Sequence, residues 1–211
     1  MNINFPILTK RILVTGGAGF IGSALIRRLL KDTSLIIFNL DKLGYASNQT
    51  SIKKLCLDLS IDIESRYQLL KVDLRNKDQI KNAFKEANPD FVFHLAAETH
   101  VDRSIEDPYS FLENNVYGTF NLLEACLEHW ERLVSERKDL FRFHHISTDE
   151  VYGSLTAKGL FSEKSQYEPR SPYAASKASS DHFVTAWNTT YGLPVVKTNC
   201  CNNYGPWQFP E

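Results

Sequence analysis

The stretch TGGAGFIG at residues 15–22 decides how the rest of the sequence can fold. Gly16, Gly19 and Gly22 give it the spacing G-x-x-G-x-x-G, and Gly17 adds G-x-G-x-x-G. A glycine trio alone is weak evidence, but this one lies between an apolar run and an amphipathic segment, which is the setting that a dinucleotide-binding turn requires. The sequence therefore predicts a strand, a tight turn and a helix whose N-terminus faces the phosphates of a dinucleotide.

An acidic residue follows at the distance that this turn requires. Asp41 lies nineteen residues after Gly22, at the end of the second predicted strand. A carboxylate there would accept hydrogen bonds from the adenosine ribose and repel a 2′-phosphate, which favours NAD over NADP. Lys42 follows directly and can soften that preference.

Short aliphatic or β-branched runs alternate with longer amphipathic segments along the chain, which is typical of an α/β protein. The expected strands are residues 11–15, 35–40, 68–72, 91–95, 141–147 and 195–198. The expected helices include stripes at 21–30 and 80–87, the second closed by Asn88-Pro89, and longer segments from about 111 to 134 and from 172 to 190. We expect a doubly wound parallel sheet of the Rossmann type, with its chemistry at the carboxyl ends of the strands.

Composition excludes several classes of protein. Hydrophobic residues make up 43%, charged residues 23%, and the formal net charge of the 211 residues is −1. These values argue against disorder and against a nucleic-acid partner or a membrane surface. No apolar run approaches the roughly 20 residues of a membrane span, and residues 1–10 lack a secretory leader, so we expect a cytoplasmic protein.

The cysteines and histidines suggest no metal site. Cys56, Cys126, Cys200 and Cys201 lack C-x-x-C spacing, and the six histidines are scattered or alternate on a strand. We expect four reduced, mostly buried thiols and no bound metal.

A tyrosine and a lysine stand four residues apart at the start of a predicted helix. Tyr173 and Lys177 therefore share one helix face. A free tyrosine titrates at about pH 10, but an ammonium and an oxidised nicotinamide nearby would favour the phenolate. Tyr173 is then a candidate base for a substrate hydroxyl, and Lys177 a candidate ligand of the nicotinamide ribose. Taken alone, Tyr173 and Lys177 are better explained as two residues on an exposed helix surface. In a chain that also has a dinucleotide-binding turn, a catalytic pair becomes the better explanation.

Two adjacent acids follow the fifth predicted strand in the triplet Thr148-Asp149-Glu150. Alcohol oxidation by Tyr173 needs no second acid and base. One protonated and one ionised carboxyl group, with pKa values pushed apart by burial and by each other, would suit the elimination of water next to a carbonyl. The alternative is that both acids cap a loop in solvent.

Five ordered blocks resemble the extended short-chain dehydrogenase/reductase family, and within it the sugar-nucleotide 4,6-dehydratases. The blocks are the glycine turn, LDKLGYA at 40–46, HLAAETHVDRS at 94–104, the triplet 148–150 with Tyr173 and Lys177, and NNYGP at 202–206. The resemblance implies that NAD oxidises a nucleoside-diphosphate-glucose at carbon 4, that water leaves across carbons 5 and 6, and that the same hydride returns to carbon 6. It places the 4-keto-6-deoxy product in deoxysugar and surface polysaccharide biosynthesis.

The resemblance also implies individual roles. Tyr173 takes the 4-hydroxyl proton with Thr148 hydrogen-bonded nearby, Asp149 protonates the departing 6-hydroxyl, and Glu150 removes the carbon 5 proton. Thr99, Thr148 and Asn202 would contact the sugar nucleotide. The expected cofactor-binding residues are Gly16, Gly19, Phe20, Ile21, Gly22, Asp41, Lys42, Leu43, Gly44, Asp73, Leu74, Leu95, Ala96, Ala97, Asn114, Tyr173, Lys177 and Asn203. For Ala96 and Ala97, plain tight packing is nearly as good an explanation.

Three departures from the family pattern stand out. Asn114 replaces a common threonine, and Trp207 replaces a common tyrosine. Family members are also longer than this chain. We expect residues 1–200 to form the NAD-binding domain and 201–211 to begin a sugar-nucleotide subdomain that is mostly absent, which makes catalysis by this polypeptide uncertain. The nucleotide base stays open, and overall similarity alone favours dTDP over UDP.

Two other functions compete with dehydration. A sugar-nucleotide 4-epimerase would share the turn, Tyr173 and Lys177 but would need no acid pair. A non-catalytic NAD-binding module, produced by evolution or by truncation, would bind the cofactor without turnover. We also expect a homodimer through a four-helix contact, because the helices at 111–134 and 172–190 carry apolar residues beyond one narrow stripe.

Overall fold

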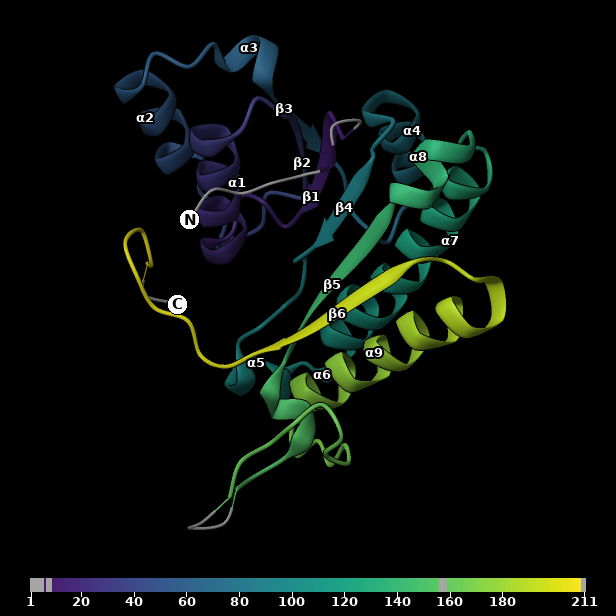
Figure 1. Ribbon diagram of the computed structural model, residues 1–211. Helices are drawn as coiled ribbons and strands as arrows, with labels where there is room; N and C mark the ends of the chain where they lie inside the picture. Colours follow the sequence, from purple (N-terminus) through teal and green to yellow (C-terminus); the bar gives the residue numbers. More distant parts are fainter. Residues whose placement is uncertain (1–5, 7–8, 156–158, 210–211) are drawn as a thin grey trace.

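A six-stranded parallel sheet forms the centre of the chain, which a computed structural model describes at residues 6, 9–155 and 159–209. The strand order is β3-β2-β1-β4-β5-β6, and every neighbouring pair is parallel (Figure 1). This confirms the predicted doubly wound α/β fold. The strands are β1 Arg11–Thr15, β2 Ile36–Asp41, β3 Tyr67–Lys71, β4 Phe91–His94, β5 Arg142–Thr148 and β6 Val195–Cys200.

Helices cover both faces of the sheet (Figure 1). They are α1 Phe20–Asp32, α2 Thr50–Asp58, α3 Ile63–Arg66, α4 Lys77–Ala87, α5 Val101–Glu106, α6 Pro108–Phe111, η1 Leu112–Tyr117, α7 Gly118–Glu131, α8 Ser135–Leu140, η2 Asp149–Tyr152 and α9 Pro172–Tyr191. In the described part of the chain no helix is long and apolar enough to cross a membrane.

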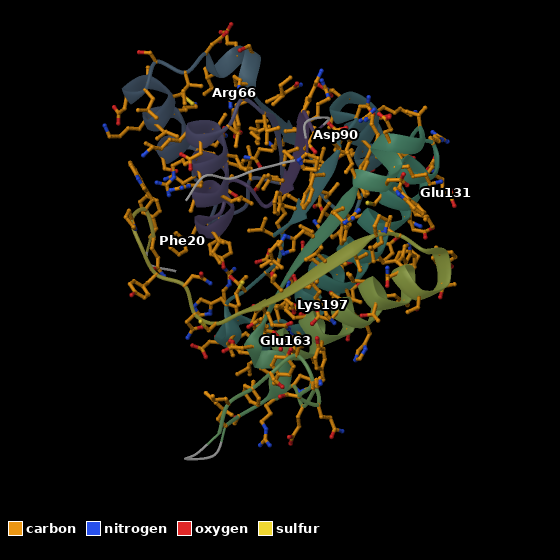
Figure 2. The ribbon with its side chains drawn as sticks, in the orientation of Figure 1. Phe20, Arg66, Asp90, Glu131, Glu163 and Lys197 are labelled. Atoms are coloured by element: carbon orange, nitrogen blue, oxygen red, sulfur yellow. The ribbon has the colours of Figure 1, made fainter. Side chains whose placement is uncertain are left out.

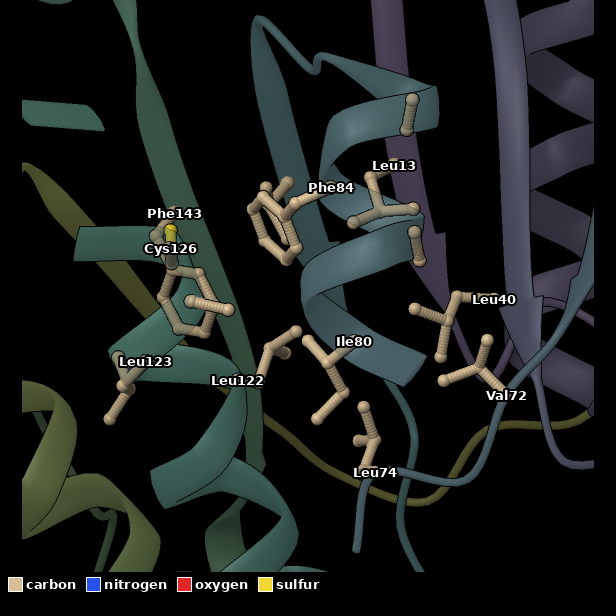
Figure 3. Packing of buried hydrophobic residues seen from close by; sticks show 14 of the residues in the cluster. Leu13, Leu40, Val72, Leu74, Ile80, Phe84, Leu122, Leu123, Cys126 and Phe143 are labelled. Atoms are coloured by element: carbon tan, nitrogen blue, oxygen red, sulfur yellow. The ribbon is translucent and has the colours of Figure 1, made fainter. Parts of the chain in front are cut away.

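The apolar run of β1 serves two separate cores. Ile12 and Val14 pack on the face covered by α1 and α2, whereas Leu13 packs on the face covered by α4 and α7. All three side chains are fully buried, because successive residues of a strand point to opposite faces. On the second face Leu13 lies near Ile80 and Phe84 of α4 (Figure 3). A strand covered on both faces is therefore apolar throughout, as the sequence predicts.

The strand order places the candidate site. From β1 the chain proceeds through β2 to β3 on one side, and from β4 through β5 to β6 on the other. The connections leaving β1 and β4 consequently run in opposite directions. Such a reversal opens a crevice beyond the carboxyl ends of the two strands.

The predicted single helix from 111 to 134 has different bounds and an irregular middle. Helical structure begins at Pro108, passes through a π-helical turn at η1, and ends at Glu131. A π turn removes backbone groups from the regular helical pattern, so they need other partners. The Asn115 carbonyl accepts a hydrogen bond from Ser180 Oγ at 2.8 Å, and the Asn115 side chain bonds Ser176 Oγ at 2.9 Å. These contacts come from α9 and stabilise the turn.

The expectation of mostly buried thiols is wrong for two of the four. Cys56 and Cys126 are buried in the two cores, but Cys200 is only partly buried and Cys201 is exposed. Both lie at the edge of the sheet, where Cys200 ends β6 and Cys201 follows it. All four thiols are free.

We predict that Leu122→Ala lowers the free energy of unfolding by about 2–5 kcal/mol, because the side chain is 0% exposed and its removal leaves a cavity. Leu57→Ala, at a position 81% exposed, should change it by less than about 0.5 kcal/mol. Urea unfolding curves followed by circular dichroism measure both. Equal effects would contradict the assigned core.

Candidate functional site

A cavity of about 360 Å³ lies at the carboxyl edge of the sheet, where the loops after all six strands meet. Its wall includes every residue predicted to bind cofactor or substrate or to act in catalysis, except Leu43 and Asp149. It also includes residues that the sequence did not single out, among them Ser47, Glu98, Cys200 and Gln208. Within the described ranges no group of three His, Cys, Asp or Glu side chains could hold a metal ion.

The glycine turn is shaped by two close backbone approaches. Gly16 has φ +70°, in the left-handed region, and a Cβ on it would lie 2.7 Å from the backbone of Ala96. A Cβ on Gly22 would lie 2.2 Å from the Gly16 carbonyl oxygen. Neither position can hold a larger residue without a backbone shift.

The helix that follows the turn begins at an open N-terminus. Gly19 caps α1 without a side-chain hydrogen bond, and the first turn contains no acidic residue. Phe20, Ile21 and Gly22 line the cavity there. Unpaired N–H groups and the helix dipole both favour an anion at this position, so the turn fits the pyrophosphate of a dinucleotide.

Asp41 organises the loops on the adenosine side of the cavity. Its Oδ2 accepts a hydrogen bond from the backbone N–H of Ala18 at 3.0 Å. Its Oδ1 accepts from the N–H of Leu43 at 2.8 Å and from Ser47 Oγ at 3.0 Å. The Leu43 backbone thus hydrogen-bonds Asp41, and Leu43 does not line the cavity. A carboxylate offers about four acceptor positions, so one remains for a ribose hydroxyl.

Lys42 is held in an ionic contact that the sequence did not predict. Its Nζ donates to Glu98 Oε1 at 2.6 Å and to Asn114 Oδ1 at 2.8 Å. Glu98 therefore offsets the positive charge that was expected to soften the preference for NAD. The same contacts occupy the side-chain oxygen of Asn114, which leaves its amide bonded to Ser110 O at 2.7 Å.

The capped start of α9 places Tyr173 and Lys177 on the cavity wall. The Ser171 hydroxyl accepts from the N–H of Ala174 at 3.0 Å, and Pro172 occupies the first helical turn. Tyr173 is 8% and Lys177 5% exposed, and Lys177 Nζ donates to Ile146 O at 2.8 Å. The two side chains lie one helical turn apart, as predicted.

Burial dominates the acid–base properties of this pair. It lowers the pKa of Lys177 to about 8, with Asp181 and Cys200 acting in the opposite direction. Burial likewise raises the pKa of Tyr173 to about 12, although a hydrogen bond with the Thr148 side chain lowers it in part. The charges of Glu150 and Asp149 raise this pKa further, so the chain without cofactor favours the neutral phenol. The expected shift toward the phenolate depends on an oxidised nicotinamide and stays a prediction.

The acid pair follows β5 directly and is not a solvent cap. Thr148 caps the short helix η2, where its hydroxyl accepts from the N–H of Glu150 at 3.3 Å. Both acids are half-buried. Burial, and next the charge of Asp149, raises the pKa of Glu150. Asp149 lies outside the cavity wall and its Oδ1 accepts from Thr148 Oγ1 at 3.4 Å.

The segment after β6 returns toward the glycine turn (Figure 2). A Cβ on Gly205 would lie 4.0 Å from the Phe20 ring. Asn202 and Asn203 line the cavity, and Asn203 Nδ2 donates to Cys201 O at 2.8 Å. Pro210 and Glu211 lie outside the described residues.

One buried charge near the site escaped the sequence analysis. Asp181 is 0% exposed on α9, four residues after Lys177 and eight after Tyr173. That spacing places all three residues on one helix face and was the signal available in the sequence. Its partners on β5 could not be identified from local spacing.

Comparisons with known proteins agree on one group of relatives. A family model described as GDP-mannose 4,6 dehydratase matches residues 13–211. A dTDP-glucose 4,6-dehydratase of Neisseria meningitidis is 51% identical over 203 residues, and a probable one of Sinorhizobium fredii is 53% identical over 201 residues. These matches cover 96% and 95% of this chain but 56% and 55% of the relatives. The chain thus spans about half the length of the curated relatives it matches.

Solved structures of both a dehydratase and an epimerase are similar to this chain. A dTDP-glucose 4,6-dehydratase of Streptomyces venezuelae with NAD bound has a TM-score of 0.81 at 41% identity, covering 95% of this chain and 58% of that one. A UDP-glucose 4-epimerase of Thermus thermophilus in complex with NAD also has a TM-score of 0.81, at 35% identity, with the same coverage.

We predict a pH-dependent difference in stability between the parent chain and Lys177→Met. The pKa of Lys177 is about 8 when folded against 10.5 for the free side chain, so the unfolded chain binds more protons between these values. The parent should therefore gain free energy of unfolding relative to Lys177→Met as pH rises from about 8 to about 10.5. Urea unfolding at several pH values measures the difference, and a constant difference across this range would contradict the assigned burial of the ammonium.

Proposed function

Because this chain belongs to the GDP-mannose 4,6 dehydratase family, we propose that it binds NAD and dehydrates a nucleoside-diphosphate-glucose to the 4-keto-6-deoxy sugar. The observation that carries the proposal is one cavity whose wall combines the glycine turn with Tyr173, Lys177 and Glu150. The names of the relatives support dTDP-glucose as the substrate. The 4-keto-6-deoxy product would then belong to deoxysugar synthesis. Residues 1–200 would form the NAD-binding domain, and 201–211 would begin the sugar-nucleotide subdomain.

The residues around the cavity fit a nicotinamide dinucleotide. The close glycine backbone and the open N-terminus of α1 suit a pyrophosphate, and Asp41 retains an acceptor for a ribose hydroxyl. Lys177 would hold the nicotinamide ribose. NAD bound here would remove hydride from carbon 4 of the sugar and return it at carbon 6.

Tyr173 would accept the proton of the sugar 4-hydroxyl. Its pKa of about 12 in the chain alone keeps the phenol neutral at pH 7, so its action as a base requires positive charge nearby. The Lys177 ammonium on the same helix face is one source of that charge. The hydrogen bond with Thr148 holds the phenol in place for the transfer.

The acid pair would carry the elimination step. Glu150 lines the cavity, and its raised pKa makes it a stronger base for the proton on carbon 5 of the 4-keto sugar. Asp149 would protonate the departing 6-hydroxyl. Since Asp149 lies outside the cavity wall, its side chain has to turn away from Thr148 to reach the sugar.

A 4-epimerase is the second candidate, favoured by the likeness to the Thermus thermophilus enzyme. It would use Tyr173 and Lys177 and leave Glu150 without a role. The third candidate is an NAD-binding chain without turnover, in which Tyr173, Lys177 and Glu150 would have no chemical role.

We predict that the chain, given NAD and dTDP-glucose, forms a 4-keto-6-deoxy sugar that is detected by its absorbance in alkali. Glu150→Gln should lower the rate by about 100-fold or more, because a positioned general base contributes that much. NAD affinity should be the same in both proteins.

The alternatives give different results in the same assay. A 4-epimer formed equally well by Glu150→Gln would favour the epimerase. Bound NAD with no product from either protein would favour the inactive chain, and no NAD binding by folded protein would contradict the assigned cofactor site.

We also infer that the chain forms a homodimer through α7 and α9. An aromatic row crosses these helices, in which Phe120 contacts Phe183 and Trp187 with ring centroids at 6.0 and 5.5 Å. Phe183 is 36% exposed, and at the ends of the row Tyr117 and Tyr191 are 46% and 50% exposed. Exposed aromatic side chains in one row suit a protein interface.

Phe183→Glu should shift the solution mass from dimer to monomer at micromolar concentration, because it places a charge in the apolar contact. Light scattering after size exclusion measures the mass. Leu57→Glu, on α2 and 81% exposed, is the matched control and should leave the mass unchanged. A monomeric parent would contradict the proposed dimer.

We infer a cytoplasmic location as well. Four free thiols suit a reducing compartment, where disulfides are rare. The net charge of −1 supports a small-molecule substrate rather than nucleic acid or an anionic membrane.

A further inference from the structure

A buried carboxylate accepts a hydrogen bond from Ser147 of the cavity wall and has no role in the mechanism above. Asp181 of α9 is 0% exposed and shares a helix face with Lys177 and Tyr173. Burying a charge costs free energy unless polar groups surround it. A carboxylate that is fully buried at this position therefore suggests a specific role.

The partners of Asp181 tie α9 to the end of β5. Its Oδ2 accepts hydrogen bonds from Ser147 Oγ at 2.8 Å and from Tyr167 OH at 2.7 Å. Its Oδ1 lies 3.1 Å from His145 Nε2. Ser147 immediately precedes Thr148, so the carboxylate fixes the strand end that carries the acid pair.

The carboxylate is ionised in this setting. Burial by itself would raise the pKa of Asp181, but the contacts with His145, Tyr167 and Ser147 outweigh burial, and the net pKa lies below its usual value. Burial lowers the pKa of His145 to about 4, so this imidazole is neutral near pH 7. The negative charge of Asp181 is therefore not cancelled by His145.

Lys177 lies one helical turn before Asp181 on the same face of α9, so it is the cation that this charge can stabilise. The titratable groups that act on the Lys177 ammonium or respond to it are Asp181 on α9, His145 on β5, His94 on β4 and Cys200 on β6. Asp181 is the carboxylate among them. The Lys177 ammonium also donates to the Ile146 carbonyl, but that bond carries no full opposite charge.

We propose that Asp181 is a positioning residue of this site, which holds the end of β5 through Ser147 and places a negative charge one helical turn from the Lys177 ammonium. Asp181 does not line the cavity, and it acts through these neighbours. The inference rests on the proposed function for its purpose, whereas the contact itself can be tested without substrate.

The test is an NMR titration of lysine in the full chain, with carbon-13 at Cε and with the Lys177 signal assigned by its loss in Lys177→Met. Asp181→Asn keeps the shape of the side chain and removes its charge. It should lower the pKa of Lys177 by about one unit, because a nearby opposite charge shifts a pKa by that amount or more. An unchanged Lys177 titration in folded Asp181→Asn would overturn the proposal.

Tyr167→Phe is the matched control. It removes one hydrogen bond to the same carboxylate oxygen and keeps the charge, so the Lys177 titration should move far less than in Asp181→Asn. A merely structural role for Asp181 would lower the thermal midpoint in both variants without moving the Lys177 titration, and that result would also overturn the proposal.

If Asp181→Asn does not fold, the coupling is measured from the other side. Lys177→Met should raise the pKa of Asp181, followed by carbon-13 at Cγ, because coupling between two sites is reciprocal. No change there would overturn the proposal. Since neither titration uses NAD or sugar nucleotide, failure of the proposed reaction would appear as absent turnover with the Lys177 shift intact.

Discussion

The glycine turn depends on a close backbone contact that leaves no room for a side chain. Gly22 of α1 approaches the Gly16 carbonyl so closely that a Cβ would lie 2.2 Å from its oxygen. This contact sets the helix directly over the end of β1, and the left-handed Gly16 turns the chain past Ala96. The open N-terminus of α1 then faces the crevice where the strand order reverses. The cavity exists because of this arrangement.

Buried charge lies in the wall of the cavity and next to it. Lys177 and Asp181 are almost or fully buried, and Glu150 is half-buried, so desolvation shifts the pKa of each toward the neutral form. For Asp181 the hydrogen bonds reverse that effect. The two apolar cores on either side of the sheet supply the stability that allows polar groups to be buried here. Electrostatic forces between buried groups are strong because the protein interior screens charge less than water does.

Local pattern was enough to predict much of this arrangement. The glycine spacing, the apolar strands and the four-residue interval between Tyr173 and Lys177 each depend on neighbours in sequence, and each lies where it was expected. The π turn at η1 was missed because its carbonyl partner, Ser180, comes from another helix. The raised pKa of Tyr173 in the chain without cofactor was not predicted, because burial is a property of the folded chain.

Contacts distant in sequence account for the remainder. Lys42 meets Glu98, and Ser147 meets Asp181, across 56 and 34 residues. No spacing rule connects such pairs, since the strand order and the packing of α9 against β5 bring them together.

Calorimetric titration with NAD of the parent chain and of Gly22→Ala tests most directly whether the glycine turn forms the cofactor site. We expect one NAD per chain in the parent. We expect no detectable binding in folded Gly22→Ala, because the added Cβ forces the turn apart. Equal affinity in the two proteins, or no binding by a folded parent, would contradict this account of the turn.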